Sequence, residues 1–512
     1  MNHRKEIYLI SIAITLIHLF IHLLIIRDYP VAWDYHYHHY AGLYHLGLPV
    51  PSINDPSSIP FAPPDPRLTT QDPFGPFTQI IPSLSQVILS DRLHLLPFDI
   101  AYNLPIVVIG SFGVGVLFIF VAQSIGLWQG MFSAIFLSLI PVYFGYVHTS
   151  MKDVGNAAAF AFAIFLFWRL ATYQRLRELI MAVISFAIAF NIKINSAVIP
   201  IICGLWYVTK FKFRILVLSY FPLAAIAAVA LWFPFWRDPS GKLLQLPNFY
   251  SHNTLGMPVL LLGKLYQSGI NIPFSYPWIY IGVSLPLGIL LTSIIGTIIA
   301  FTKSSKGKHI YTLILLWLFV PLLRYVSSST GAIDGIRHFL EIVYPLSILA
   351  AIGLYSIIRI IFDKWGRTPA ILATFAIIVP LIYNVIHFHP YQTSFFNAFA
   401  GGIKGAQSKF DIDFWGTPQR QAIEWINTNA PSGSTVYVAM AQSSAALYAR
   451  EDLKRLLNIK SIWESDYSVV LNRQSFFEFG DLKQYVNERV NTKSVVYTVS
   501  IDNVPLAWIV KN

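Results

Sequence analysis

Long apolar runs separated by short polar segments dominate the chain up to about residue 388. A membrane-spanning helix needs roughly 20 predominantly apolar residues. By that length the pattern predicts about eleven transmembrane helices, at residues 7–26, 101–122, 126–147, 155–172, 176–191, 195–209, 213–235, 276–301, 309–326, 339–361 and 369–388. The sequence therefore predicts a polytopic α-helical membrane protein.

The pattern changes near Pro390, where polar residues become frequent and the apolar segments become short. Helical periodicity and turn signals predict helices at 419–430, 444–457 and 482–490, and strands at 434–440, 466–472, 494–500 and 506–511. Alternating short strands and helices are typical of an α/β unit. We therefore predict a transmembrane domain over residues 1–389, with a long loop at 27–100, and a small α/β domain over 390–512.

Basic residues mark alternate loops, which predicts the orientation of the chain. Cytoplasmic loops of membrane proteins carry an excess of Lys and Arg. Five basic clusters share one phase if the N-terminus is cytoplasmic: Arg4 and Lys5; Arg169, Arg175 and Arg177; Lys210, Lys212 and Arg214; Lys303, Lys306 and Lys308; Lys364 and Arg367. An odd number of spans then places the C-terminal domain outside the cell membrane. The first run has no small-residue cleavage site, so we expect a retained span.

The loop at 27–100 contains two distinct segments. Residues 49–66 are rich in proline and are expected to be extended. Residues 84–95 are apolar but too short to cross a bilayer, so they predict an interfacial helix in the membrane plane.

The composition of the chain supports a membrane protein and indicates which kinds of partner to expect. Apolar residues make up 55% of the chain and charged residues only 12%, against about 25% charged residues in soluble proteins. From Tyr391 onward there are 12 Lys and Arg against 11 Asp and Glu, whereas the rest has 24 against 14. The excess positive charge thus lies in the membrane part, where it sets orientation, and we expect membrane lipids but no nucleic acid as partners. The one cysteine, Cys203, excludes an intrachain disulfide.

Ionisable residues near a membrane are costly and are therefore candidates for function. The predicted topology places seven of them at the outer ends of spans, where they could line one cleft: Asp34, Lys152, Asp153, Lys193, Asp334, Arg337 and His338. Arginine binds phosphate through a planar fork and lysine binds it as a point charge. The alternative is that these groups only reach toward headgroups or mark topology.

Asp34 lies in an unusual segment, PVAWDYHYHHYAGLYH, directly after the first span. Its neighbours Tyr35 and His36 could remove water from the carboxylate, which would raise its pKa and make it a better base. The alternative is an interfacial belt of aromatic residues.

The histidines allow a test for metal binding. His36, His38 and His39 have irregular or strand-like spacing, and His18 and His22 share one face of the first span. A divalent metal is one interpretation. Hydrogen bonding within the bundle and at the interface is the interpretation that we favour, so we expect no metal site and no cofactor.

Several motifs together resemble a known superfamily. They are the acidic residue in the first outer loop, the Lys-Asp pair before the fourth span, and the sequences GIRHFLEIVYP, DPFGPFTQIIPSLSQ, VHTSMKDVGNAAAFAFAIFLFWRL and HPYQTSFFNAFAGGIKGAQSKFDIDFWG. In order and in predicted membrane side they resemble the GT-C membrane glycosyltransferases, in the branch of protein O-mannosyltransferases and aminoarabinose transferases. The resemblance covers most of residues 1–430. Many relatives carry an acidic pair in the first loop, whereas Tyr35 follows Asp34 here, which weakens the case for a metal.

The resemblance implies a fold and a reaction. The fold would be GT-C-like, and the enzyme would transfer a hexose or pentose from a polyprenyl-phosphate donor to an acceptor hydroxyl on the outer face, with inversion. Asp34 would be the base, and Asp153 would orient the sugar or the lysine. Phosphate would be bound by Lys152, Arg337 and His338. Further candidates for substrate binding are Tyr35, His36, Lys193 and Asp334. The acceptor could be a glycan, a lipid or a protein.

Two other classes of function remain as alternatives. A secondary transporter would show internal repeats and charges near the membrane midplane, whereas the charges here are predicted at one face. A non-catalytic scaffold with an outer binding domain is the other alternative. The enzyme hypothesis requires Asp34, Lys152 and Arg337 to converge on one cleft.

Overall fold

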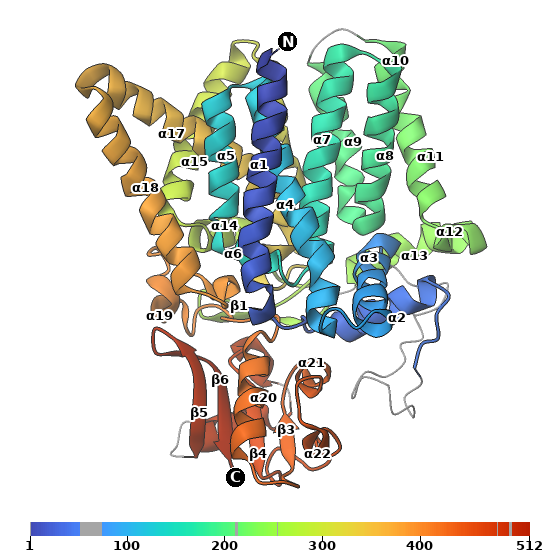
Figure 1. The fold of residues 1–512 in the computed structure, drawn as a ribbon, viewed down its shortest axis with the longest axis vertical. Coiled ribbons are helices and arrows are strands. Elements are labelled where there is room, and N and C mark those ends of the chain that lie inside the picture. Colours follow the sequence, from blue (N-terminus) through green and yellow to red (C-terminus); the bar gives the residue numbers. More distant parts are fainter. Residues whose placement is uncertain (1, 52–73, 210–212, 253, 479, 491–493) are drawn as a thin grey trace.

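The structure is a computed structural model that describes residues 2–51, 74–209, 213–252, 254–478, 480–490 and 494–512. It is a bundle of helices that carries a small β-sheet unit at one end (Figure 1). Most of the predicted proline-rich segment at 49–66 lies outside the described residues, as do Lys210 and Lys212.

The helices of the bundle and its loops occupy most of the first 400 residues. Their bounds are α1 Asn2–Ile25, α2 Tyr35–His45, α3 Pro76–Gln86, α4 Phe98–Ser124, α5 Leu127–Ser138, α6 Pro141–Tyr146, α7 Asn156–Tyr173, α8 Leu176–Ile192, α9 Val198–Val208, α10 Ile215–Leu218, α11 Tyr220–Leu231, α12 Pro234–Arg237, α13 Pro239–His252, α14 Tyr276–Ser284, α15 Leu287–Ser305, α16 His309–Phe319, α17 Val343–Trp365, α18 Arg367–His387 and α19 Gly402–Ala406. A hairpin of β1 Pro258–Leu261 and β2 Lys264–Gln267 lies between α13 and α14.

Among the described residues, seven helical segments are long and apolar enough to cross a membrane, so the chain is a polytopic helical membrane protein. They are Arg4–Asp28, Phe98–Ser124, Met151–Tyr173, Leu287–Ser305, His309–Val326, Gly335–Trp365 and Arg367–His387. Shorter apolar helices occupy Leu127–Ser138, Ile194–Val208 and Ile215–Leu231. The predicted count of eleven is therefore not reached by this criterion.

Proline explains two of the differences from the predicted spans. Pro141 separates α5 from α6, and Pro286 separates α14 from α15. The residue before a proline avoids the helical region, so each of these two apolar runs is divided between two helices. Apolar length alone did not reveal the breaks.

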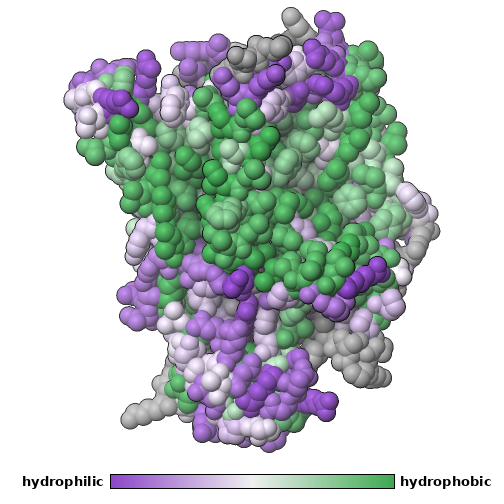
Figure 2. Space-filling view, viewed as in Figure 1, coloured by the Kyte–Doolittle hydropathy of each residue, from purple (hydrophilic) through white to green (hydrophobic). Residues whose placement is uncertain are grey.

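An apolar belt crosses the face of the bundle seen in Figure 2, with polar surface at both ends. The N-terminus and the α17–α18 junction lie at one end, and the sheet unit and the C-terminus lie at the other (Figure 1). Within the bundle, α15 and α17 approach closely, because a Cβ at Gly296 or Gly353 would overlap the backbone of the opposite helix. The belt is the surface that hydrocarbon would cover.

The C-terminal unit contains a four-stranded sheet in the order β3-β4-β6-β5. Strands β3 and β4 are parallel, and the β4–β6 and β6–β5 pairs are antiparallel. The elements are α20 Pro418–Asn429, β3 Val436–Val438, α21 Gln442–Ala446, α22 Glu451–Lys454, β4 Tyr467–Leu471, α23 Leu482–Tyr485, β5 Val495–Ile501 and β6 Val504–Lys511. The four predicted strands are confirmed, and the helix predicted at 444–457 is divided into two short ones.

Two short helices border the end of the bundle that carries the sheet. The histidines of the first loop lie on α2, which is an α-helix. Their spacing had suggested a strand or an irregular segment, and the structure corrects this. Helix α2 packs closely on α3, since a Cβ at Gly42 would overlap Ser83. A π-helical turn, η2 Val87–Arg92, continues α3, and the segment predicted at 84–95 is thus largely helical.

Candidate active site

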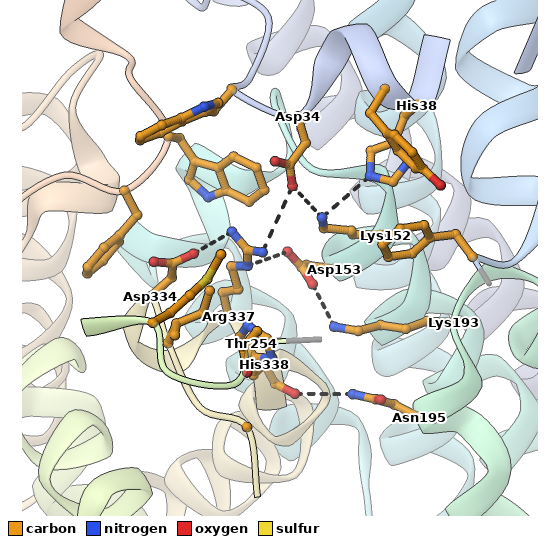
Figure 3. Close-up of a pocket in the computed structure, with 18 of the residues that line it drawn as sticks. Asp34, His38, Lys152, Asp153, Lys193, Asn195, Thr254, Asp334, Arg337 and His338 are labelled. Carbon is orange, nitrogen blue, oxygen red and sulfur yellow. Dashed lines mark hydrogen bonds and ion pairs between the residues drawn. The ribbon is translucent and has the colours of Figure 1, made fainter. Parts of the chain in front are cut away.

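A cavity of about 710 Å³ lies between the bundle and the C-terminal unit, at the end of the bundle that carries the sheet. Its polar lining comes from the N-terminal end of α2, the π-helical turn η3 Met151–Gly155, the α8–α9 connection, the 3₁₀ helix η6 Gly335–Ile342 and the C-terminal unit. Figure 3 shows the central side chains pointing toward one another. The lining includes eight of the nine residues that the sequence predicted for the site: Asp34, His36, Lys152, Asp153, Lys193, Asp334, Arg337 and His338.

Two carboxylates of the cavity each have a lysine partner. The Nζ of Lys152 is 2.5 Å from Oδ2 of Asp34, and the Nζ of Lys193 is 2.7 Å from Oδ1 of Asp153 (Figure 3). Lys152 and Asp153 are therefore neighbours in sequence that have different partners. Lys152 pairs with the first loop, whereas Asp153 pairs with the α8–α9 connection. The expected contact between Asp153 and its neighbouring lysine is replaced by a contact with Lys193.

Arg337 lies among three carboxylates. Its Nη1 is 2.7 Å from Oδ2 of Asp334, its Nε is 3.7 Å from Oδ2 of Asp153, and its Nη2 is 4.0 Å from Oδ2 of Asp34. One face of the guanidinium lies over the ring of Trp415, with Cζ 4.3 Å from the ring centroid. Stacking fixes the plane of the guanidinium, so its donors keep their directions toward the cavity.

Positive charge exceeds negative charge in the lining. Three carboxylates (Asp34, Asp153 and Asp334) face five cations (Lys152, Lys193, Arg324, Arg337 and Arg473). Of these five cations, Arg324 has its nearest carboxylate partner at the greatest distance, because its Nη2 is 3.9 Å from Oε1 of Glu341. A partly enclosed site with surplus cations favours an anion such as a phosphate.

The carboxylate of Asp34 faces the cavity instead of capping its helix. Asp34 occupies the N-cap position of α2 but makes no side-chain capping hydrogen bond, which forgoes roughly 1 kcal/mol of helix stability. The side chain is 39% exposed and lines the cavity. The chain thus places an accessible carboxylate at the cavity wall.

The expected raised pKa of Asp34 is wrong for the ligand-free protein. Burial acts to raise the pKa of Asp34, but attraction to Lys152 and Arg337 outweighs it and holds the pKa well below the usual carboxyl range. Burial, with the positive charge of Lys152 next, lowers the pKa of His38 to about 3. Asp34 is therefore ionised and His38 neutral near pH 7.

Asp153 is less accessible than we expected of a catalytic carboxylate. Its side chain has no exposed surface, and Oδ2 accepts a 2.8 Å hydrogen bond from Oγ of Ser150. With Lys193 on Oδ1 and Arg337 beside Oδ2, its oxygens are surrounded by protein donors. We therefore interpret Asp153 as a residue that positions Lys193 and Arg337.

Tyr35 does not line the main cavity but a smaller pocket beside it, together with Asp34, Lys152 and Trp415, so its contact with a substrate stays a prediction. Its hydroxyl donates a 2.8 Å hydrogen bond to Oε1 of Gln86, and its ring stacks on His39 at 5.3 Å between centroids. Helix α2 turns this side chain into the packing against α3 and α4. The adjacent His36 does reach the cavity, where its Nδ1 lies 2.9 Å from Oγ of Ser443 in the C-terminal unit.

The backbone of His338 helps to shape the opposite wall. Its carbonyl oxygen accepts a 3.2 Å hydrogen bond from Nδ2 of Asn195 and another from Arg324. Its ring atom Nε2 is buried and has no hydrogen-bond partner among the described residues. A buried nitrogen of this kind is costly unless a ligand or water satisfies it.

Several lining residues were not among the predicted site residues, and they include Asn195, Arg324, Trp415 and Arg473. Trp415 lies in a quoted motif, FDIDFWG, but an aromatic residue gives no charge signal. Arg473 is distant in sequence and lies in the C-terminal unit, where no motif was found. Arg324 sits at the end of an apolar run, and this interruption is a signal that could have been used.

The histidines that we tested for metal binding make hydrogen bonds. Nδ1 of His18 lies 2.8 Å from Oγ of Ser111, and Nδ1 of His22 lies 3.1 Å from Nε2 of His148. Among the residues described by the structure, no group of three or more His, Cys, Asp or Glu is arranged to hold a metal ion. The hydrogen-bonding interpretation thus describes what His18 and His22 do.

Several solved structures are similar to this chain. The chain is similar to ArnT from Cupriavidus metallidurans, both in the apo state and bound to undecaprenyl phosphate, with 11% identity, 98% of this chain and 97% of that chain covered, and a TM-score of 0.49. The Archaeoglobus fulgidus oligosaccharyltransferase tethered with an acceptor peptide has 11% identity, 92% and 69% coverage, and a TM-score of 0.49. No curated protein matches the chain.

A family model matches part of the transmembrane bundle. Residues 99–236 match the model of the dolichyl-phosphate-mannose-protein mannosyltransferase family. This segment includes the Lys-Asp pair and Lys193, and it runs from the start of α4 to α12. The match confirms the resemblance of the chain to the GT-C superfamily of membrane glycosyltransferases.

Proposed function

We propose that the protein transfers a sugar from a polyprenyl-phosphate donor to an acceptor hydroxyl, with inversion at the anomeric carbon. One observation carries the proposal: Asp34, Lys152 and Arg337 converge on a single cavity in which cations outnumber carboxylates. The match to a family described by its lipid-phosphate sugar supports the same donor class. Convergence on one cavity favours an enzyme over a transporter, which would need a polar path through the bundle.

The roles of the charged residues follow from their distances. A donor phosphate would compete with Asp34 for Lys152 and would approach the Nη2 of Arg337, whose present distance to Asp34 is 4.0 Å. Drawing Lys152 toward the phosphate would free Asp34 and let its pKa rise toward the usual carboxyl range. Donor binding would thereby turn a well-neutralised carboxylate into a better base.

The proposed step balances without a cofactor. Asp34 takes the proton of the acceptor hydroxyl, the acceptor oxygen attacks the anomeric carbon, and the carbon–oxygen bond to the phosphate breaks. Lys152 and Arg337 stabilise the charge that develops on the departing phosphate. The products are the glycosylated acceptor and free polyprenyl phosphate.

A donor panel tests this proposal. Purified full-length protein is incubated with a series of polyprenyl-phosphate sugars, each with candidate glycan, lipid and peptide acceptors, and release of free polyprenyl phosphate is measured. We expect release with at least one donor and loss of release in Asp34→Asn, which keeps the shape of the side chain. If no donor is consumed under conditions in which the protein remains folded, the proposal is contradicted.

We also propose that the C-terminal unit faces outward and the N-terminus faces the cytoplasm. The basis is the positive-inside rule, together with the N-terminus and the α17–α18 junction, which carry two of the basic clusters and lie at the end of the bundle opposite the sheet (Figure 1). The cavity would then open on the outer face of the cell membrane. A transferase placed there would use donors presented outside the cell.

Cysteine labelling tests the orientation with low background, because the one native cysteine, Cys203, is buried. Ser432→Cys places an exposed thiol in the C-terminal unit, and Ser305→Cys places one at the opposite end of the bundle. On intact cells, an impermeant thiol reagent should label Ser432→Cys and spare Ser305→Cys. The reverse pattern would invert the proposed orientation.

A further inference from the structure

Arg473 reaches from the C-terminal unit into the cavity. It lies between β4 and the 3₁₀ helix η8 Gln474–Glu478, and its Nη2 is 2.6 Å from Oδ1 of Asp334. The side chain is only 5% exposed. The pair therefore joins the two parts of the molecule through a buried contact between opposite charges.

Asp334 divides its two oxygens between two arginines. Arg473 binds Oδ1, and Nη1 of Arg337 binds Oδ2 at 2.7 Å. One negative charge is thus shared by two guanidinium groups in a poorly solvated site, where charge interactions are strong. Asp334 can orient Arg337 through this geometry, but it does not cancel the positive charge of Arg337.

The surroundings fix Arg473 in this position. Its Cζ lies 3.9 Å from the ring centroid of Phe476 and 5.5 Å from that of Trp33, so cation–π contacts hold the guanidinium. Asp334 itself adopts a left-handed backbone conformation with φ of 55°, which is costly for a residue other than glycine. Such a conformation persists when neighbouring contacts hold it, and Arg473 supplies one of them.

From this geometry we infer that Arg473 is a positioning residue, which neutralises Asp334 and so keeps Arg337 available to the donor phosphate. The inference rests on the proposed function for the identity of the anion. Without Arg473, the full charge of Asp334 would act on Arg337 and draw it away from Asp34 and Asp153. The C-terminal unit is thus a part of the phosphate site, although none of its residues needs to touch the phosphate.

Binding of undecaprenyl phosphate to the full-length protein in detergent tests the inference. Arg473→Met removes the charge and keeps an unbranched side chain, and we expect roughly tenfold weaker binding, the scale of one charge-assisted contact. The double variant Arg473→Met/Asp334→Asn removes the charge that Arg473 compensates, so its affinity should return to within about threefold of wild type. Arg455→Met, at an exposed site of the same unit, is the matched control and should bind like wild type.

The two other outcomes of the binding test overturn the inference. Unchanged affinity in Arg473→Met means that Arg337 does not depend on Arg473. A double variant that binds as weakly as Arg473→Met means that Arg473 acts on the ligand directly or only supports the fold.

A ligand-free measurement separates this inference from the proposed function. Experimental structures of the wild type and of Arg473→Met should show Arg337 shifted in the variant so that it also contacts Oδ1 of Asp334, with its Nη2 farther from Asp34 than in the wild type. If the wild type does not bind undecaprenyl phosphate, the proposed donor class fails, while this shift still decides the positioning role. An unmoved Arg337 overturns it.

Discussion

Two buried clusters of charge lie at opposite ends of the bundle, and they are built differently. At the end near the N-terminus, Arg169 binds Glu178 with two parallel contacts, Nε to Oε2 at 2.9 Å and Nη2 to Oε1 at 2.8 Å. At the end that carries the sheet, Arg337 divides its donors among three carboxylates at 2.7, 3.7 and 4.0 Å. In the first arrangement the bidentate pair is joined by Arg177, whose Nη2 is 3.1 Å from Oε1 of Glu178, whereas the second arrangement leaves donors of Arg337 under-used.

The exposure of the carboxylates shows the same difference. The side chain of Glu178 has no exposed surface, whereas that of Asp34 is 39% exposed and faces a cavity. A bidentate pair satisfies both charges and gains little from a further ligand. Burial of charge alone therefore does not indicate function, and incomplete pairing beside a cavity is the more informative signal.

The largest expected effect comes from Asp34→Asn. The amide keeps the shape of the side chain but takes no proton, so single-turnover transfer should fall by about 10²- to 10⁴-fold. Glu178→Gln, the same change in the other cluster, should leave transfer per folded molecule within a few-fold of wild type. Transfer by Asp34→Asn at near wild-type rate would mean that Asp34 is not the base.

The next effect is on stability, where we expect the change at Glu178 to have the larger effect and the change at Asp34 the smaller. Glu178→Gln leaves Arg169 without its buried partner, which should lower the free energy of unfolding by about 3 kcal/mol. Asp34→Asn should cost less than about 1 kcal/mol, because the side chain of Asp34 is 39% exposed and Arg337 keeps Asp334 and Asp153 as partners. Thermal unfolding in detergent measures both, and equal losses would remove the distinction between the clusters.

A smaller effect is expected on donor binding. Lys152→Ala and Arg337→Ala should each weaken the binding of polyprenyl phosphate by roughly ten- to a hundredfold, the worth of a charge-assisted hydrogen bond. Arg169→Ala, in the charge cluster at the other end of the bundle, serves as the control and should bind as the wild type does. Titration of each variant with the lipid phosphate measures the affinity. Unchanged affinity in both cavity variants would leave these cations as markers of topology.

The smallest effect is a shift in pH dependence. Asp34 has a lowered pKa in the ligand-free protein, so it stays ionised on acidification, and kcat/KM should fall only below the usual carboxyl range near about pH 4. Lys152→Met removes the main attraction that lowers this pKa, so the acid limb of the profile should move to higher pH. A limb in the same place in both proteins would show that another group controls it.

The sequence predicted the membrane class and the members of the cavity better than their pairing. Asp34, Lys152, Arg337 and the other outer charges were found because charge next to an apolar run is rare and visible in one dimension. Partner choice was not predictable, since Lys152 and Asp153 are neighbours in sequence yet face different partners in space. The sequence did not show that Tyr35 packs against α3 and α4 outside the main cavity, and Arg473 was missed because only the tertiary fold brings it to the cavity.

The wall of the cavity includes residues from near both ends of the sequence, Trp33 and Phe476. Synthesis proceeds from the N-terminus at roughly 5–20 residues per second, so the interval between these two residues lasts on the order of 20–90 s. During that time the bundle can enter the membrane while the cavity still lacks its last wall. The wall of the cavity is therefore complete only after synthesis has passed Phe476, long after the first helix has been made.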